Sequence, residues 1–267
     1  MKHTQNKGTA LITGASSGIG AVYADRLAKR GYDLILVARD DKRMQKIADR
    51  LTTETGRRVD IVKADLTAKA DLLRVEEILK TDKEITLLIN NAGIAVAEKF
   101  SEADMNKIES MLNLNVTALT RLTGAAIPGF IARNQGTIIN IASIVALAPE
   151  LVGIVYSGSK AYVLAFTQGL HNELIGKNIH VQAVLPGATS TEIWERAGVD
   201  LSHFPKEMVM STEKMVDAAL VGLDNKELIT IPSLPDQKDW EKFNAARLAL
   251  GPNLSRSEPA ARYKLHS

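Results

Sequence analysis

Short apolar runs alternate with amphipathic stretches along most of the chain. Seven runs predict buried strands, at residues 9–13, 33–38, 59–63, 86–90, 137–142, 179–185 and 228–231. Stretches with helical spacing of apolar residues lie between them, at 19–30, 41–55, 68–80, 155–175 and 211–224. Strands that are apolar without alternation are typical of a parallel sheet covered on both faces. The pattern therefore predicts an α/β fold with a doubly wound parallel sheet of about seven strands.

A long helical region follows the fourth predicted strand. Ser101 and Asp104 have the spacing of a capping box, which predicts that a helix opens there. We expect this region to break near Asn115 and again near Pro128.

Two segments lack clear periodicity. Residues 188–210 contain Gly198 and Pro205, and a long irregular segment in a compact domain is often a lid, so we expect a substrate loop there. Residues 251–267 are polar with two prolines and are expected to form a loosely held tail. Because no repeat or linker interrupts the chain, residues 1–267 are predicted to form a single domain.

Composition narrows the class of protein. With 45% hydrophobic and 24% charged residues, the 267-residue chain is typical of a soluble globular protein, and a net charge of +2 argues against nucleic-acid binding. The absence of cysteine excludes disulfides, thiol nucleophiles and thiolate metal sites, and the scattered histidines predict no other metal site. No apolar run is long enough to span a membrane or to form a signal-peptide core, so we expect a cytoplasmic protein.

Tyr156 and Lys160 form a candidate proton-transfer pair. Four residues apart on a helix, they lie on one face. An ammonium beside a phenol favours the phenolate, so we expect the pKa of Tyr156 to fall from about 10 towards neutrality. A tyrosine with such a pKa exchanges a proton at pH 7. The pair by itself is equally compatible with a partly exposed tyrosine beside a solvated lysine.

A glycine-rich turn joins the first predicted strand to the first predicted helix. Glycines there allow the backbone to approach a pyrophosphate, and a helix N-terminus favours that anion electrostatically. A plain tight turn is the alternative. The position between strand and helix favours dinucleotide binding.

Several motifs together resemble the short-chain dehydrogenase/reductase family. The turn reads Thr-Gly-x-x-x-Gly-Ile-Gly, as in that family, and matching motifs follow in the family's order over roughly residues 7–231. They are Asn90-Asn91-Ala92-Gly93, Asn115 in Leu-Asn-Val, Ser143, Tyr156-x-x-x-Lys160 and Pro186-Gly187 with Thr191. The resemblance implies a Rossmann fold and an NAD(P)-dependent oxidoreductase.

The resemblance also implies catalytic roles. Tyr156 would protonate a substrate carbonyl oxygen, or take the alcohol proton in reverse, and Ser143 would donate a hydrogen bond to the same oxygen. Lys160 would lower the pKa of Tyr156 and bind the nicotinamide ribose. Asn115 would hold a water that links Lys160 to solvent. Its alternative role is that of a polar residue bonding local backbone at a helix break.

The expected dinucleotide contacts come from the same motifs. They comprise Gly14, Ser16, Ser17, Gly18, Ile19, Gly20, Arg39, Asp65, Leu66, Asn91, Ala92, Gly93, Tyr156, Lys160, Pro186, Gly187, Thr189 and Thr191. Asp65 could instead cap the next helix.

The tip of the second strand bears on the choice of cofactor. Ala38 stands where relatives that prefer NAD usually have aspartate, and Arg39 could pair with a 2′-phosphate through its planar fork. Asp40 and Asp41 could instead neutralise Arg39 or approach an unphosphorylated ribose. NADP(H) is favoured over NAD(H).

The residues expected to face the substrate are mostly apolar, which suits an uncharged ketone, aldehyde or alcohol. They are Ile94, Ala95, Val96, Ile144, Val145, Leu147, Leu151, Val152, Ile193 and Trp194. Alternatives are reduction of a 3-oxo group on an acyl thioester, reduction of a C=C bond, and a dinucleotide sensor without turnover.

The helix of Tyr156 also bears on assembly. Relatives usually form dimers or tetramers through the two long helices that flank the fifth strand, which implies a homodimer or homotetramer. The second of these helices is apolar nearly all round, and Gly158 within it suggests that something packs closely against that face.

Overall fold

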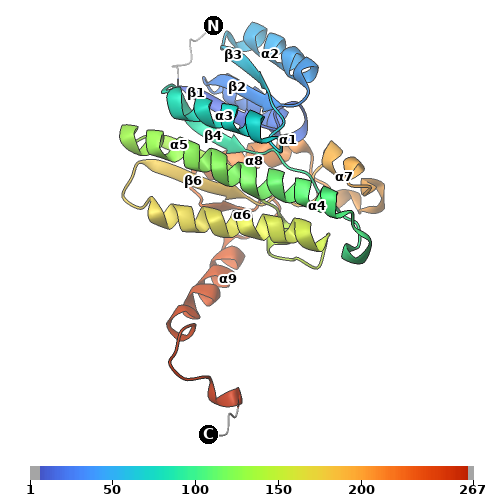
Figure 1. The fold of residues 1–267 in the computed structure, drawn as a ribbon, viewed down its shortest axis with the longest axis vertical. Coiled ribbons are helices and arrows are strands. Elements are labelled where there is room, and N and C mark those ends of the chain that lie inside the picture. The colour runs from blue at the N-terminus through green and yellow to red at the C-terminus, as the bar shows by residue number, and fades with distance from the viewer. Residues whose placement is uncertain (1–6, 264–267) are drawn as a thin grey trace. The chain divides into compact units, whose positions relative to one another are not determined.

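The computed structural model describes residues 7–263, which divide into two compact units. The first ends at Pro232 and the second begins at Ser233. Figure 1 shows the sheet and its helices in the first unit and the helix α9 in the second.

The first unit is built on one parallel sheet. Its seven strands have the order β3-β2-β1-β4-β5-β6-β7, and every neighbouring pair is parallel. They are β1 (Thr9–Thr13), β2 (Asp33–Ala38), β3 (Val59–Lys63), β4 (Ile85–Asn90), β5 (Gly136–Ile141), β6 (Ile179–Val184) and β7 (Ile229–Thr230). The strand order reverses between β1 and β4, and ligands of such sheets bind at that reversal, outside the carboxyl ends of the strands. The doubly wound α/β fold is confirmed.

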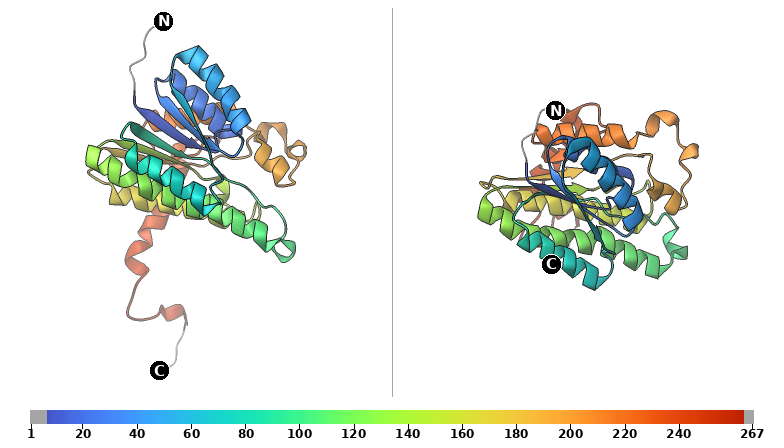
Figure 2. Two further views of the ribbon diagram at one scale, coloured as in Figure 1. Left: turned by 45° about the horizontal axis from the view of Figure 1, so that its top comes forward. Right: turned by 90° about the horizontal axis from the view of Figure 1, so that it is seen from above.

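Helices cover both faces of this sheet (Figure 2). On one face pack α1 (Gly18–Lys29), α2 (Asp41–Thr55) and α8 (Thr212–Asp224). On the other pack α3 (Lys69–Thr81), α5 (Leu119–Arg133) and α6 (Ile154–Glu173). Successive strand residues enter opposite cores, as Leu11 and Ile12 do, which explains why the strands show no polar alternation.

A buried polar chain ties the second helical layer to the sheet. Asn90 at the end of β4 donates to the side chains of Thr123 on α5 and Asn140 on β5, each at 2.9 Å. Asn140 in turn donates to Thr167 on α6, also at 2.9 Å. Because an unpaired buried polar group costs free energy, these bonds constrain where α5 and α6 lie against β4 and β5.

The region after β4 differs from the sequence expectation. Only a single 3-10 turn, Phe100–Glu102, forms near Ser101, and α4 (Met105–Leu112) begins with Asp104 as its N-cap. The expected break near Asn115 is a π-helical turn, Asn113–Ala118, and α5 runs on through Pro128 without ending. Pro128 is exposed, so solvent can satisfy the backbone group that it leaves unpaired.

The expected substrate loop is largely ordered. Residues 188–210 contain α7 (Glu192–Arg196) and two 3-10 turns, Leu201–His203 and Lys206–Met208. A parallel bridge joins Thr189 to Met210, and the Thr212 hydroxyl donates to the Ser190 carbonyl at 2.7 Å. The loop therefore has both ends held together beside α8.

The second unit contains α9 (Gln237–Ala249), a helix that the sequence analysis does not predict. Asp236 caps it by accepting from the Lys238 amide, and the rings of Trp240 and Phe243 lie 5.6 Å apart. The helix lacks a continuous apolar stripe, so periodicity could not reveal it. Among the described residues, no helix combines the length and hydropathy required to cross a membrane.

Candidate active site

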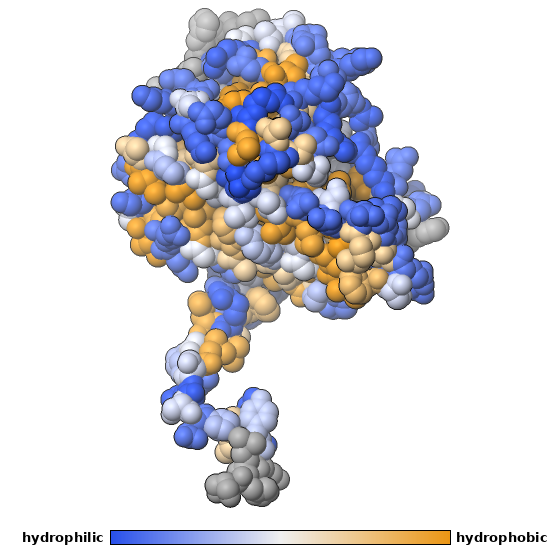
Figure 3. Space-filling view, in the orientation of Figure 1, coloured by the Kyte–Doolittle hydropathy of each residue, from blue (hydrophilic) through white to orange (hydrophobic). Residues whose placement is uncertain are grey.

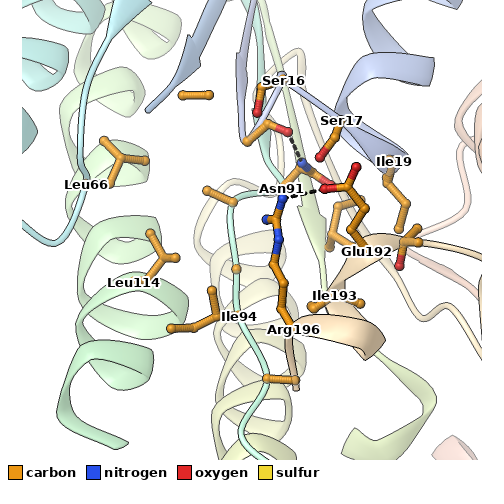
Figure 4. A pocket seen from close by; sticks show the side chains of 18 of the residues that line it. Ser16, Ser17, Ile19, Leu66, Asn91, Ile94, Leu114, Glu192, Ile193 and Arg196 are labelled. Carbon is orange, nitrogen blue, oxygen red and sulfur yellow. Dashed lines mark hydrogen bonds and ion pairs between the residues drawn. The ribbon is translucent and has the colours of Figure 1, made fainter. Parts of the chain in front are cut away.

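A cleft of about 880 Å³ opens at the carboxyl ends of the strands. The glycine turn, the tip of β2, the segments after β4, β5 and β6, the start of α6 and the short helix α7 all line it. Figure 4 shows Ser16 and Ser17 of the turn, Ile94 after β4, and Glu192 and Arg196 of α7 around this space.

The floor of the cleft is a close contact between the ends of β1 and β4. The Thr13 hydroxyl accepts from the amides of Asn91 and Ala92, at 2.9 and 3.0 Å, and the Asn91 amide side chain donates to the Thr13 carbonyl at 2.8 Å. Gly14 has a positive φ of 65°, and a Cβ there would lie 2.8 Å from Asn91 Nδ2. Only glycine therefore fits this position.

The first turn of α1 is open to an anion. Its N-cap residue, Ser17, makes no side-chain capping bond, and the turn contains no acidic residue. The free amide groups and the helix dipole favour a phosphate at this position. These features fit the diphosphate of a dinucleotide.

Tyr156 and Lys160 enter the cleft from the start of α6. A Cβ at Gly153, the residue before α6, would lie 2.2 Å from the Val96 carbonyl oxygen, so glycine is required where the helix begins against the segment after β4. Both Tyr156 and Lys160 are buried. Lys160 Nζ donates to the Ile141 carbonyl at the end of β5, at 2.9 Å.

The prediction that the pKa of Tyr156 falls towards neutrality is wrong for this structure. Burial raises the pKa of Tyr156 to about 12, and a hydrogen bond with Ser143 lowers it by less than burial raises it. Burial also lowers the pKa of Lys160 to about 8. The spacing argument considered the charge of Lys160 but not desolvation, which disfavours both charged forms.

Ser143 lies beside Tyr156, and Asn115 lies near Lys160. Ser143 follows β5 by two residues, and its hydroxyl donates to the Pro186 carbonyl at 3.4 Å and accepts from the Val145 amide at 3.3 Å. Asn115 donates to the Ile94 carbonyl at 2.9 Å and to the Ser159 hydroxyl at 3.2 Å. A Cβ at Gly93 would lie 3.1 Å from Asn115 Oδ1 and 3.6 Å from Lys160 Nζ, so these two side chains meet behind Gly93.

Most residues predicted from the motifs line this one cleft. They are Gly14, Ser16, Ser17, Gly18, Ile19, Arg39, Asp65, Leu66, Asn91, Ala92, Gly93, Ser143, Tyr156, Lys160, Pro186, Gly187, Thr189 and Thr191. Gly20 and Asn115 are not among the lining residues. Gly20 lies against the Gly14 carbonyl, where a Cβ would approach to 2.4 Å, and Asn115 is buried behind the wall.

The apolar wall is smaller than expected. Ile94, Ala95, Val96, Ile193 and Trp194 line the cleft. The other candidates, Ile144, Val145, Leu147, Leu151 and Val152, are not among its lining residues. They follow β5 in a short 3-10 turn and loop, where Val145 enters a core and Leu151 is exposed.

Sequence reasoning missed an ion-pair cluster at the cleft. Arg43 on α2 pairs with Glu192 on α7, which also pairs with Arg196. Arg43 and Glu192 are 149 positions apart, and no motif includes either, so only the tertiary structure reveals the pair. Among residues 7–263, no group of three or more His, Asp or Glu side chains is arranged to hold a metal ion.

Solved structures resemble the whole chain closely. A short-chain dehydrogenase from Sphingobium yanoikuyae in complex with NADPH is 48% identical, with a TM-score of 0.93, covering 96% of this chain and 100% of its own. A bulky-bulky ketone specific alcohol dehydrogenase from Comamonas testosteroni is 44% identical, with a TM-score of 0.89, covering 97% and 99%.

Sequence comparison identifies the same group of enzymes. The very-long-chain 3-oxoacyl-CoA reductase of Anas platyrhynchos is 35% identical over 189 residues, which are 69% of this chain but only 60% of that relative's length. Residues 8–201 match the family described as short chain dehydrogenase. The chain therefore belongs to the short-chain dehydrogenase/reductase family of oxidoreductases, which act on alcohols and ketones.

Proposed function

We propose that the protein reduces an apolar ketone or aldehyde with NADP(H), or oxidises the matching alcohol, with Tyr156 as acid and base. One observation carries this proposal: the glycine turn and the group Ser143, Tyr156 and Lys160 open into the same cleft. Dinucleotide-binding and proton-transfer elements are thereby brought together, as hydride transfer to a carbonyl requires.

The protonation states support the reductive direction. Because burial raises the pKa of Tyr156 to about 12, its hydroxyl is protonated at neutral pH and can donate to a carbonyl oxygen. Ser143 is available to share that oxygen, since the bonds of its hydroxyl with the Pro186 carbonyl and the Val145 amide are long, at 3.4 and 3.3 Å. Positive charge on Lys160 favours the phenolate that remains after proton transfer.

A bound nicotinamide would supply the hydride. The residues that would hold the dinucleotide are those of the glycine turn, the 91–93 segment and Pro186 to Thr191. Lys160 reaches the cleft beside Gly93 and would bind the nicotinamide ribose, and Asn115 behind it would position a water.

NADP(H) is the proposed cofactor because of the tip of β2. Arg39 is exposed at the cleft, and residues 7–263 provide it with no side-chain hydrogen bond or ion pair. Its guanidinium is therefore available to a 2′-phosphate. The Sphingobium structure contains NADPH, which supports the same choice.

An apolar carbonyl compound is the proposed substrate. Ile94, Val96 and Ile193 line the cleft and pack in one apolar cluster with Tyr156, and Trp194 also lines the cleft. The Comamonas relative is described as specific for bulky-bulky ketones. A wall of this kind excludes water from the reacting carbonyl and binds hydrocarbon.

A second candidate is reduction of the 3-oxo group of an acyl thioester. The Anas relative is named as a 3-oxoacyl-CoA reductase. Lys107 lines the cleft, where its ammonium could bind the negatively charged carrier of the thioester. Lys107 is already paired with Glu98 at 2.8 Å, which weakens this alternative.

We also propose a homo-oligomer that assembles through α5 and α6. These helices lie side by side on one face, where apolar patches gather (Figures 1 and 3). Gly158 and Gly169 are exposed, and no neighbouring element of the described residues comes within 4 Å of a Cβ built at either. A second copy could therefore approach this face closely.

Replacing Tyr156 with Phe tests the chemistry. The change removes the proton donor, and carbonyl reduction should fall about 10²–10⁴-fold while NADPH fluorescence still reports binding. Tyr162→Phe is the matched control on the same helix, because its hydroxyl bonds Thr120 away from the cleft. Retained turnover in Tyr156→Phe would remove Tyr156 as the acid.

A comparison of substrates separates the two candidate functions. A higher kcat/KM for a 3-oxoacyl thioester than for bulky ketones would favour the second candidate.

The pH dependence of stability tests the burial of Lys160. Its pKa is about 8 in the fold and about 10.4 when unfolded, so the buried cation lowers stability below pH 8 and that effect fades as pH rises. The free energy of unfolding of the wild type, minus that of Lys160→Met, should therefore rise by about 2 kcal/mol between pH 7.5 and 10. Urea unfolding at several pH values measures it. Parallel profiles would show that Lys160 does not titrate there.

Arg39→Asp tests cofactor choice. A carboxylate at the tip of β2 repels a 2′-phosphate and accepts bonds from ribose hydroxyls, so the preference should shift from NADPH to NADH. Fluorescence titration with both cofactors gives the ratio of dissociation constants. An unchanged ratio would place the determinant elsewhere.

Sedimentation at micromolar concentration tests assembly. The wild type should sediment as a dimer or tetramer, and Gly158→Arg on the exposed face of α6 should reduce its mass by blocking close approach. Lys46→Glu is the control, because Lys46 is exposed on α2, which packs on the opposite face of the sheet. A monomeric wild type would contradict the proposal.

A further inference from the structure

Arg43 connects two distant parts of the cleft. It lies in the first turn of α2, and its Nη1 donates to both carboxylate oxygens of Glu192 on α7, at 2.8 and 2.9 Å. Its Nε also lies 3.5 Å from a carboxylate oxygen of Asp40, the N-cap of α2. The guanidinium is thus held by two carboxylates from opposite sides.

Glu192 extends over the cleft from α7. It also forms an ion pair with Arg196, one helical turn further along (Figure 4). Arg43, Glu192 and Arg196 all line the main cleft. The carboxylate therefore stands between two arginines inside the space assigned to the dinucleotide.

Arg43 lies close to the tip of β2 and lines the cleft. In this fold the tip of β2 faces the ribose that carries the 2′ group. Arg39 follows β2 directly, and Arg43 lies four residues on, beyond the N-cap of α2. Its planar fork, which now holds a carboxylate, is equally suited to a phosphate.

The ion pair between Arg43 and Glu192 can be broken at little cost in stability. The side chains are 48% and 39% exposed, and exposed ion pairs contribute little to stability. Its consequence is geometric: the pair keeps the guanidinium directed into the cleft. A phosphate with greater charge can displace a single carboxylate there.

We propose that Arg43 is a second ligand of the 2′-phosphate, and that Glu192 occupies its guanidinium until a phosphorylated cofactor displaces the carboxylate. This inference rests on the NADP(H) preference proposed above. It adds that discrimination against NAD(H) depends on exchange between α2 and α7, and not only on Arg39. Glu192 then acts as a competitor that weakens binding of every ligand that uses Arg43.

Calorimetric binding of 2′,5′-ADP and 5′-AMP tests the exchange without turnover. Arg43→Gln should weaken 2′,5′-ADP about tenfold or more and change 5′-AMP less than about twofold, because only the former carries the phosphate. Glu192→Gln should tighten 2′,5′-ADP about two- to fivefold by removing the competing carboxylate.

A double variant and a matched control separate exchange from general charge effects. In Arg43→Gln/Glu192→Gln the gain from Glu192→Gln should vanish, since the shared guanidinium is gone. Glu195→Gln removes the same charge from α7 at a residue outside the main cleft and should leave both affinities unchanged.

The outcomes distinguish this inference from the proposed cofactor preference. If the wild type binds 2′,5′-ADP more tightly than 5′-AMP but Arg43→Gln weakens both equally, Arg43 is not a phosphate ligand and the NADP(H) preference stands. If the gain from Glu192→Gln persists in the double variant, Glu192 acts through general charge and the exchange is overturned. Equal wild-type affinity for the two ligands overturns both proposals.

Discussion

The close approach of β1 and β4 at their carboxyl ends is the constraint on which the cleft depends. Asn91 donates two hydrogen bonds to Thr13 across it, and Gly14 has no room for a side chain. The strand order reverses at this point, so the helices that follow β1 and β4 diverge to opposite faces and leave a crevice. A larger residue at position 14 would separate the strands and displace the turn that opens α1.

Burial decides the electrostatics of the proton-transfer group. α6 is anchored at its start by the contact of Gly153 with Val96 and along its side by the bond from Lys160 to the Ile141 carbonyl. Tyr156 and Lys160 are consequently removed from solvent, which favours the neutral form of both. In the proposed reaction, Tyr156 would therefore begin as a proton donor, and the amine of Lys160 beside it would stabilise the charge that develops on the phenol.

Some parts of the site are formed by residues that are neighbours in sequence, and others by residues that are far apart in sequence. The glycine turn, the Tyr156–Lys160 spacing and the segment at 91–93 are each contained in a few consecutive residues and are common to the family. The ion pair between Arg43 and Glu192 joins two elements that the family motifs do not connect. In our proposals, selectivity for the cofactor thus depends on how α7 lies over the cleft, while the chemistry depends on residues fixed by their own helix and strand ends.

The sequence by itself determined the parallel sheet, the order of its elements along the chain and most of the motif residues that meet in the cleft, because apolar strands and short motifs are local signals. It also placed Asn115 at a helix irregularity, although the irregularity is a π-helical turn and not a break. Only the tertiary structure decided the pKa direction of Tyr156, the start of α4 at Met105, the course of α5 through Pro128 and the pairing of Arg43 with Glu192. Desolvation, solvent access and contacts across 149 positions depend on what surrounds a residue in space, and residue spacing along the chain carries no record of them.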